Sequence, residues 1–247
     1  RVDTAVEALA LSIGEKARVD MAYMGQLTGK DENTLFADLQ GVVFLNPDYG
    51  ERGGEKYLPA DEYLSGNVRR KLAEVRTKAE TEPQYLSNVE ALEKVQPVDL
   101  TASEISVRLG ATWLDPAYIR QFIFETLDTS RRARWDIKVH YSRITGEWRI
   151  EGKSKDSYNV KAYSTYGTSR ASAYDIIESS LNLKDVRIYD TIEDAEGKPK
   201  RVLNKRETML AQQKQQVIKD AFANWVWQDP QRRIALVKQY NELFNST

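Results

Sequence analysis

The chain has 247 residues, of which 41% are hydrophobic and 10% aromatic, so it can form one large domain or two small ones. This composition predicts a folded protein and excludes disorder over most of the length. The 36 basic and 37 acidic residues leave a net charge of −1, which excludes a uniformly basic nucleic-acid coat.

The residue types that are missing narrow the chemistry further. The absence of cysteine excludes disulfides, thiolate nucleophiles and cysteine-ligated metals. His140 is the one histidine, and it lies in a predicted strand without a partner motif, so we assign it a structural role. The sequence has no apolar run of about 20 residues and no signal peptide. We therefore expect a cytoplasmic protein without membrane contact, and the start at Arg1 predicts a piece of a longer chain.

The first part of the chain, residues 1–97, is predicted to be a helical lobe. A short strand is expected at Val42–Leu45, followed by a loop over 46–55 that is rich in glycine. Apolar residues recur at helical spacing in five segments, around 6–13, 19–28, 32–39, 60–81 and 85–95.

The second part, residues 98–247, is predicted to be a mixed lobe. Alternating apolar residues predict a hairpin over 135–150 and further strands at 158–162 and 186–188, which together give a small, mainly antiparallel sheet of three or four strands over about 135–190. Helices are expected over 116–127, 170–181, from about 205, and from 230 to 244, so the chain should end in a helical hairpin. The predicted fold class is therefore α+β, mostly helical.

No catalytic motif of nucleotide or methyl-donor chemistry is readable in the sequence. It lacks a phosphate-binding Gly-Lys-Ser/Thr run and a strand followed by clustered glycines, so we expect no catalytic residue, metal or cofactor in this chain. The run Phe44–Tyr49 resembles the Asn-Pro-Pro-Tyr motif of amino-group DNA methyltransferases, but Asp48 replaces the second proline. We therefore interpret it as a loop that follows a strand.

Charge is unevenly distributed along the chain. Residues 1–60 hold six basic and ten acidic side chains, residues 131–161 hold nine and four, and residues 198–247 hold ten and four. Clustered cations favour phosphate contact, so we place a DNA contact on the hairpin and on the loop that leads into the C-terminal helices. The predicted contact residues are Arg131, Arg132, Arg134, Arg143, Lys153, Lys198, Lys200, Arg201, Lys205 and Arg206.

Two further features of the second lobe bear on nucleic-acid binding. The order helix, turn, helix, basic hairpin over about 101–151 is also that of a winged helix, with Pro116–Leu127 as recognition helix. Its run Phe122–Phe124 is too apolar for a major-groove face, which favours a mixed fold with a solvated basic edge. The tryptophans, Trp135 included, are expected mostly in the core by their spacing, whereas Tyr141 and Tyr158 could stack on bases or pack.

Five blocks of the sequence resemble one family, the large bacterial and phage proteins that join an adenine-amino DNA methyltransferase region to a Swi/Snf-type helicase region. The blocks lie within Ser12–Lys30, Ala60–Arg69, Val107–Trp113, Tyr166–Leu183 and Lys214–Asn245. The resemblance implies a segment that follows the methyltransferase motifs and precedes the helicase core. It implies S-adenosylmethionine and ATP as cofactors of the parent protein, with flanking methyltransferase and helicase domains as partners, and it carries no catalytic residue onto this chain.

The sequence supports three functional hypotheses. The first is a non-catalytic, helicase-proximal module that contacts DNA and couples it to the methyltransferase and the motor. The second is a structural spacer or protein-docking domain, in which exposed apolar rather than basic surface should dominate. The third is an anti-restriction or anti-defence component.

Overall fold

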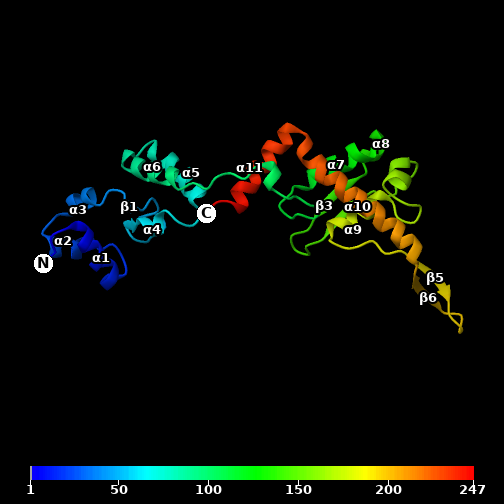
Figure 1. Ribbon diagram of the computed structural model, residues 1–247, viewed down its shortest axis with the longest axis horizontal. Helices are drawn as coiled ribbons and strands as arrows, with labels where there is room; N and C mark the ends of the chain where they lie inside the picture. Colours follow the sequence, from blue (N-terminus) through cyan, green and yellow to red (C-terminus); the bar gives the residue numbers. More distant parts are fainter. Residues whose placement is uncertain (1) are drawn as a thin grey trace. The chain divides into compact units, whose positions relative to one another are not determined.

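The computed structural model describes residues 2–247 and divides the chain into two compact units. The first unit runs to Leu100 and includes Lys238–Thr247, and the second unit is Thr101–Val237. Helices dominate, and the described strands pair in antiparallel two-stranded sheets, which confirms the predicted α+β class (Figure 1).

The first unit opens with three short helices and a strand pair. The side chains of Thr4, Asp20 and Asp31 cap the three helices, since each accepts a hydrogen bond from the backbone amide three residues later. A core of apolar side chains that includes the fully buried Met24 and Leu35 holds these elements together. The elements are α1 (Ala5–Lys16), α2 (Met21–Thr28), α3 (Glu32–Asp38), β1 (Val43–Leu45) and β2 (Tyr57–Pro59).

The rest of the first unit is a helical layer built on the buried Phe44, Leu72 and Leu92. The single helix predicted over 60–81 is broken after Tyr63, because the Asn67 side chain accepts a hydrogen bond from the Arg70 amide and begins a second helix. The elements are α4 (Ala60–Tyr63), α5 (Val68–Ala79), η1 (Pro83–Tyr85) and α6 (Leu86–Lys94).

The second unit is built on long helices. Phe122 packs edge-on against Phe222 and Trp225, and these rings form the centre of its core. Asp229 forms the corner between the last two helices and accepts the Arg232 amide, and the division between the units falls within the last helix. The helical elements are η2 (Ala102–Glu104), α7 (Pro116–Leu127), α8 (Arg131–Arg134), η3 (Lys161–Thr165), α9 (Ala173–Leu181), α10 (Lys205–Gln228) and α11 (Pro230–Phe244).

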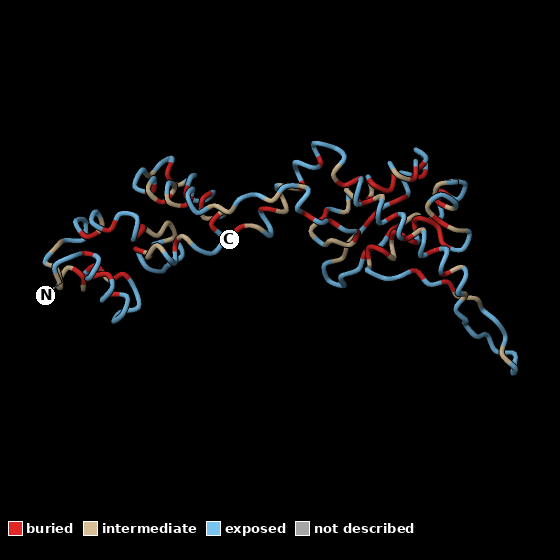
Figure 2. Tube along the Cα trace, in the orientation of Figure 1, coloured by how far each residue is buried: buried red, intermediate tan, exposed pale blue. Residues whose placement is uncertain are grey.

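The strands of the second unit form two separate hairpins rather than one sheet of three or four strands. The first hairpin pairs β3 (Lys138–Tyr141) with β4 (Trp148–Glu151), and the second pairs β5 (Tyr189–Glu193) with β6 (Pro199–Leu203). Figure 2 shows the second hairpin exposed along most of its length.

Two predicted strands are wrong for identifiable reasons. At 158–162 the Asn159 side chain accepts the amides of Lys161 and Ala162 and starts a helical turn. Residues 186–188 form no strand, and α10 takes the place of a neighbouring strand. The Val186 amide donates to the Gln215 side chain and the Ile188 amide donates to Thr208.

Candidate nucleic-acid interface

Helix α8 displays two free cations. Ser130 caps it and the buried Ala133 anchors it to the unit, so Arg131 and Arg132 face solvent. Neither guanidinium has a hydrogen bond or ion pair with any residue that the structure describes. Arg134 differs, because its Nε donates to the Thr129 carbonyl at 2.8 Å and its guanidinium lies over the Phe124 ring. Of these three predicted contact residues, two are available for a ligand and one supports the local fold.

Trp135 corrects a sequence prediction. Alternation with Ile137 and Val139 placed it in the core, but its side chain is 82% exposed. The amides of Asp136 and Ile137 both donate to the Ala133 carbonyl, so the helical turn of α8 continues past Trp135 and the strand begins only at Lys138. The two-residue period therefore does not extend back to the tryptophan, and the indole points into solvent.

The turn over 152–158 brings a second aromatic ring and a third free cation to the same region. Gly152 lies against Asp136 so closely that an added Cβ would be 2.3 Å from the Asp136 carbonyl oxygen. Lys155 is exposed and has no ion pair among the described residues. Tyr158 is 99% exposed, and between these two side chains the buried Asp156 carboxylate fixes the turn to the core.

Arg132, Lys155 and Tyr158 line a shallow pocket of about 640 Å³, and Arg131 and Trp135, which belong to α8 and its C-terminal end, lie outside its lining. Of the pocket's carboxylates, Asp128 is paired with Lys161 and Asp156 is held by hydrogen bonds. Phosphates and stacked bases both fit such a mixture of cations and rings. We call the set Arg131, Arg132, Trp135, Lys155 and Tyr158 the aromatic–basic surface.

The other predicted contact residues lie elsewhere in the second unit. Arg143 is exposed in the β3–β4 turn, whereas Lys153 is committed to ion pairs with Glu178 at 2.9 Å and Asp175 at 3.3 Å. The remaining five, Lys198, Lys200, Arg201, Lys205 and Arg206, lie on β6, its turn and the first turn of α10. Figure 1 places α8 well apart from the β5–β6 hairpin, so the ten residues do not form one patch.

The β5–β6 hairpin is also less basic than its sequence window indicated. Its second strand and turn carry Lys198, Lys200 and Arg201, but Asp190, Glu193, Asp194 and Glu196 lie on the paired strand and in the turn. The Arg201 guanidinium stacks on the Tyr189 ring at 4.2 Å. Strand pairing therefore places four carboxylates beside three cations. The charge count over residues 198–247 omitted these carboxylates because all four precede residue 198.

His140 lies in a strand, as the sequence predicted. It lies on β3 opposite Arg149, and its Nε2 is 3.4 Å from a Glu151 carboxylate oxygen. The hydrogen bond to His140 lowers the pKa of Glu151. Within residues 2–247, no group of three or more His, Cys, Asp or Glu side chains is placed to hold a metal ion.

The three-helix region at the N-terminus has a different surface. Its order of three helices followed by a strand pair is that of a winged helix, with α3 in the recognition position. Residues 1–60 hold ten carboxylates, and Asp31, Glu32 and Asp38 lie on or beside α3. The described cations are all engaged by a carboxylate or a tyrosine ring: Lys16, Arg18, Lys30, Arg52 and Lys56.

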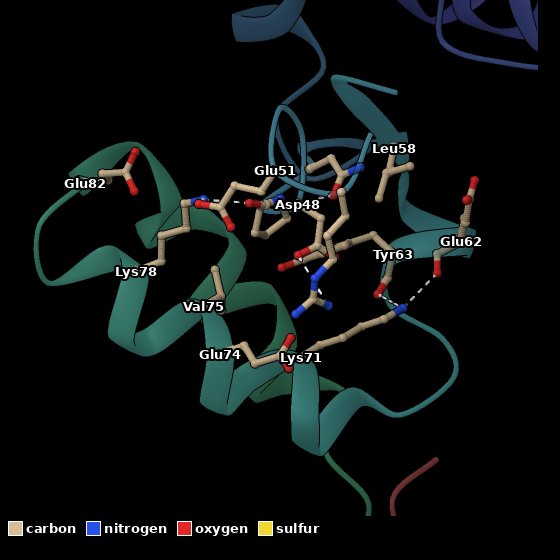
Figure 3. A pocket seen from close by; sticks show the side chains of 13 residues that line it. Asp48, Glu51, Leu58, Glu62, Tyr63, Lys71, Glu74, Val75, Lys78 and Glu82 are labelled. Carbon is tan, nitrogen blue, oxygen red and sulfur yellow. Dashed lines mark hydrogen bonds and ion pairs between the residues drawn. The ribbon is translucent and has the colours of Figure 1, made fainter. Parts of the chain in front are cut away.

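A second pocket, of about 420 Å³, lies in the first unit between the loop after β1 and helix α5 (Figure 3). Five carboxylates line it: Asp48, Glu51, Glu62, Glu74 and Glu82. Lys71 donates to three backbone carbonyls, and Lys78 donates to the Pro47 carbonyl. Arg52, Lys71 and Lys78 give the pocket three cations against these five carboxylates, so its net charge is negative and opposes a phosphate-bearing ligand.

The Asn46–Tyr49 segment is the loop that the sequence predicted. Asn46 closes the loop with its own side chain, donating from Nδ2 to the Glu55 carbonyl and accepting the Asp48 amide. Both polar atoms are therefore used within the loop.

Two family models match the chain. Residues 108–246, more than half of the chain, match the family described as "Domain of unknown function (DUF8437)", and residues 1–57 match "Probable helicase, winged helix domain". No curated protein and no solved structure matches it. The N-terminal match supports a helicase-associated region and locates the winged helix at α1–β2 rather than at 101–151, where Phe122 and Ile123 are fully buried. No helix in the described part of the chain is long and apolar enough to span a membrane.

Proposed function

Because the chain belongs to the DUF8437 family and begins with a helicase-type winged helix, we propose that it is a non-catalytic module that contacts DNA for a helicase. The contact is made by the aromatic–basic surface of the second unit. The five blocks that resemble methyltransferase–helicase fusions support a parent protein of that kind. In such a parent the flanking domains bind S-adenosylmethionine and ATP, and this chain couples DNA to them.

The observation that carries the proposal is the availability of three cations on one surface. Arg131, Arg132 and Lys155 have no ion pair among the described residues, whereas the described cations of the winged helix are all engaged. Free cations gain most from phosphate contact because they release condensed counterions from DNA without first breaking an internal ion pair. The DNA contact therefore belongs to the second unit, and the winged helix is a poor phosphate binder.

The test compares two double variants by fluorescence anisotropy over a range of salt concentrations. Replacing Arg131 and Arg132 with Ala should weaken duplex binding and lower the logarithmic salt slope by about 1.8, or about 0.9 for each lost phosphate contact. The matched control replaces Lys30 and Lys56 with Ala and should leave the slope unchanged, because both lysines are already paired. A wild-type chain that binds no DNA, or an arginine variant with unchanged affinity and slope, would leave the structural spacer as the better interpretation.

The proposal also assigns no turnover to this chain by itself. Calorimetry with ATP and with S-adenosylmethionine should show no tight binding to the isolated chain. Tight binding followed by product formation would restore the enzyme class. An anti-restriction role differs from the proposal in requiring a protein target, and it predicts binding to a restriction subunit in the absence of DNA.

A second candidate function rests on the acidic winged helix. Residues 2–60 hold ten carboxylates and five cations, so the excess charge of this domain is negative and suits a basic protein surface better than DNA. Titration of the chain with the purified helicase core of the same protein would test it. Binding that weakens with salt and is lost on charge reversal of Asp3 and Glu7 to Lys, two exposed carboxylates without an ion pair among the described residues, would support protein docking.

A further inference from the structure

Resting on the proposed DNA contact, we infer that the aromatic–basic surface binds single-stranded DNA. Bases stack on the rings of Trp135 and Tyr158, while Arg131, Arg132 and Lys155 neutralise the phosphates between them. The cations alone suit both duplex and single-stranded DNA, whereas the two rings favour the single strand.

The first argument is the exposure of the two rings. Trp135 is 82% and Tyr158 is 99% exposed, and no ring–ring or cation–π contact with another described residue holds either of them. Large aromatic side chains normally contribute to the core, and exposed ones that lie near one another beside cations are typical of binding surfaces. The rings add nothing to the packing of this unit, so a ligand is the better explanation of their position.

The second argument is the chemistry of the ligand. In a duplex the flat faces of the bases are covered by neighbouring base pairs, whereas in a single strand they are free to stack on a protein ring. The cations next to the rings require an anionic partner. Among the described residues, the pocket carboxylates Asp136 and Asp156 make no ion pair, so the three free cations of the surface exceed the unpaired negative charge by one. A polyanion with free aromatic faces meets both requirements.

The third argument is that the surface is held in place. Asp156 accepts hydrogen bonds from Tyr174 and Asn159. It lies between Lys155 and Tyr158 in the sequence, so these bonds fix the turn that carries both side chains. Because Gly152 has no side chain, the same turn packs closely against the backbone of Asp136, the residue that follows Trp135. Both rings are thus attached to one rigid part of the unit, which lowers the entropy cost of binding.

The experiment uses the full 247-residue chain and two fluorescein-labelled probes, an oligothymidylate of about 12 nucleotides and a blunt duplex of equal length. The single strand should bind at least about tenfold tighter than the duplex. Trp135→Ala and Tyr158→Ala should each weaken single-strand binding by about 5- to 100-fold and leave duplex binding within about twofold. Trp135→Phe and Tyr158→Phe retain a ring and should bind like the wild type.

The matched control is Tyr49→Ala, which removes an exposed tyrosine from the acidic first unit. It should not change binding to either probe. Circular dichroism melting of each variant shows whether it remains folded, and the phenylalanine variants keep the test valid if an alanine variant is unstable.

The outcomes separate this inference from the proposed function. If neither probe binds to the wild type, both fail. If both probes bind equally and the alanine variants bind like the wild type while the double Arg131/Arg132 variant loses affinity, the single-strand inference fails and the DNA contact stands. If the alanine variants change the oligomeric state in size-exclusion chromatography without changing DNA affinity, the rings serve a protein contact and the inference is overturned.

Discussion

The Tyr174 hydroxyl donates a hydrogen bond of 2.7 Å to Oδ2 of Asp156, inside the second unit. Both residues are buried, and the Thr129 hydroxyl lies 2.9 Å from the same phenolic oxygen. Burial raises the pKa of Tyr174, and the negative charge of Asp156 raises it further, while the contact with Thr129 acts in the opposite direction. The phenol therefore stays protonated at neutral pH and supports a carboxylate that makes no ion pair with any described residue.

Tyr174→Phe should destabilise the second unit by about 1–3 kcal/mol, because it leaves the buried Asp156 carboxylate short of one donor. Urea unfolding followed by circular dichroism measures the loss. DNA affinity should fall as well, since Asp156 anchors the turn that carries Lys155 and Tyr158. Equal stability of variant and wild type would show that Asn159 and Ser130 together satisfy the carboxylate.

Lys153 and Arg131 should respond differently to alanine, although the sequence predicted the same role for both. Burial lowers the pKa of Lys153, but the hydrogen bond and charge of Glu178 and the charge of Asp175 outweigh it, so the pKa is raised overall. Lys153→Ala should cost at most about 1 kcal/mol of stability, since the pair is partly solvated, and should leave the DNA salt slope unchanged. Arg131→Ala should lower the slope by about 0.9 without a change in stability. A lower slope for the Lys153 variant would contradict the structural role.

The raised pKa of Tyr63 predicts that the first unit loses stability at high pH. Burial raises its pKa to about 12, and the nearby Asn88 side chain lowers the pKa by a smaller amount. The phenol and the Asn88 side chain do not form a hydrogen bond of normal geometry. A raised pKa means that the folded state retains the proton after the unfolded state has lost it, above pH 10. The stabilising contribution is therefore complete below pH 10 and should fall by about 1.4 kcal/mol by pH 11.

Comparison with Tyr63→Phe isolates this effect. The hydroxyl has no hydrogen-bond partner among the described residues, so its removal should be neutral or stabilising at pH 8. Urea unfolding at pH 8 and pH 11 should show a smaller loss for the variant than for the wild type. Equal losses would assign the pH dependence to other groups.

Gly152→Ala and Gly197→Ala form a matched pair, because both glycines have a φ of 76°. A Cβ on Gly197 meets nothing within 4 Å, whereas a Cβ on Gly152 would be 2.3 Å from the Asp136 carbonyl oxygen. The Gly197 variant should lose about 1–2 kcal/mol or less, from the left-handed conformation alone. The Gly152 variant should lose more and should also weaken DNA binding, since Asp136 must move. Thermal melts with anisotropy on both variants check this, and similar losses would show that the close contact is relieved cheaply.

Local sequence patterns determined most of the elements. Helix starts follow from side chains that cap backbone amides within three residues, as at Asp31 and Ser130. The β3–β4 hairpin follows from alternation between buried and exposed positions, with Val139 and Ile150 paired on the buried face. Both signals act over a few residues, so a single sequence contains them in full.

Tertiary structure decided which of the predicted contact residues are available. Whether Lys153 is free depends on Glu178, which is 25 positions away, and the charge of the β5–β6 hairpin depends on its strand register. The amides of Val186 and Ile188 donate to the side chains of Gln215 and Thr208 rather than to a neighbouring strand. Trp135 changes from core to surface because α8 extends its turn by one residue. Each of these outcomes depends on a partner that is distant in sequence or on the exact residue at which an element ends. Hydrophobic periodicity and charge counts describe neither the distant partners nor the exact ends of elements.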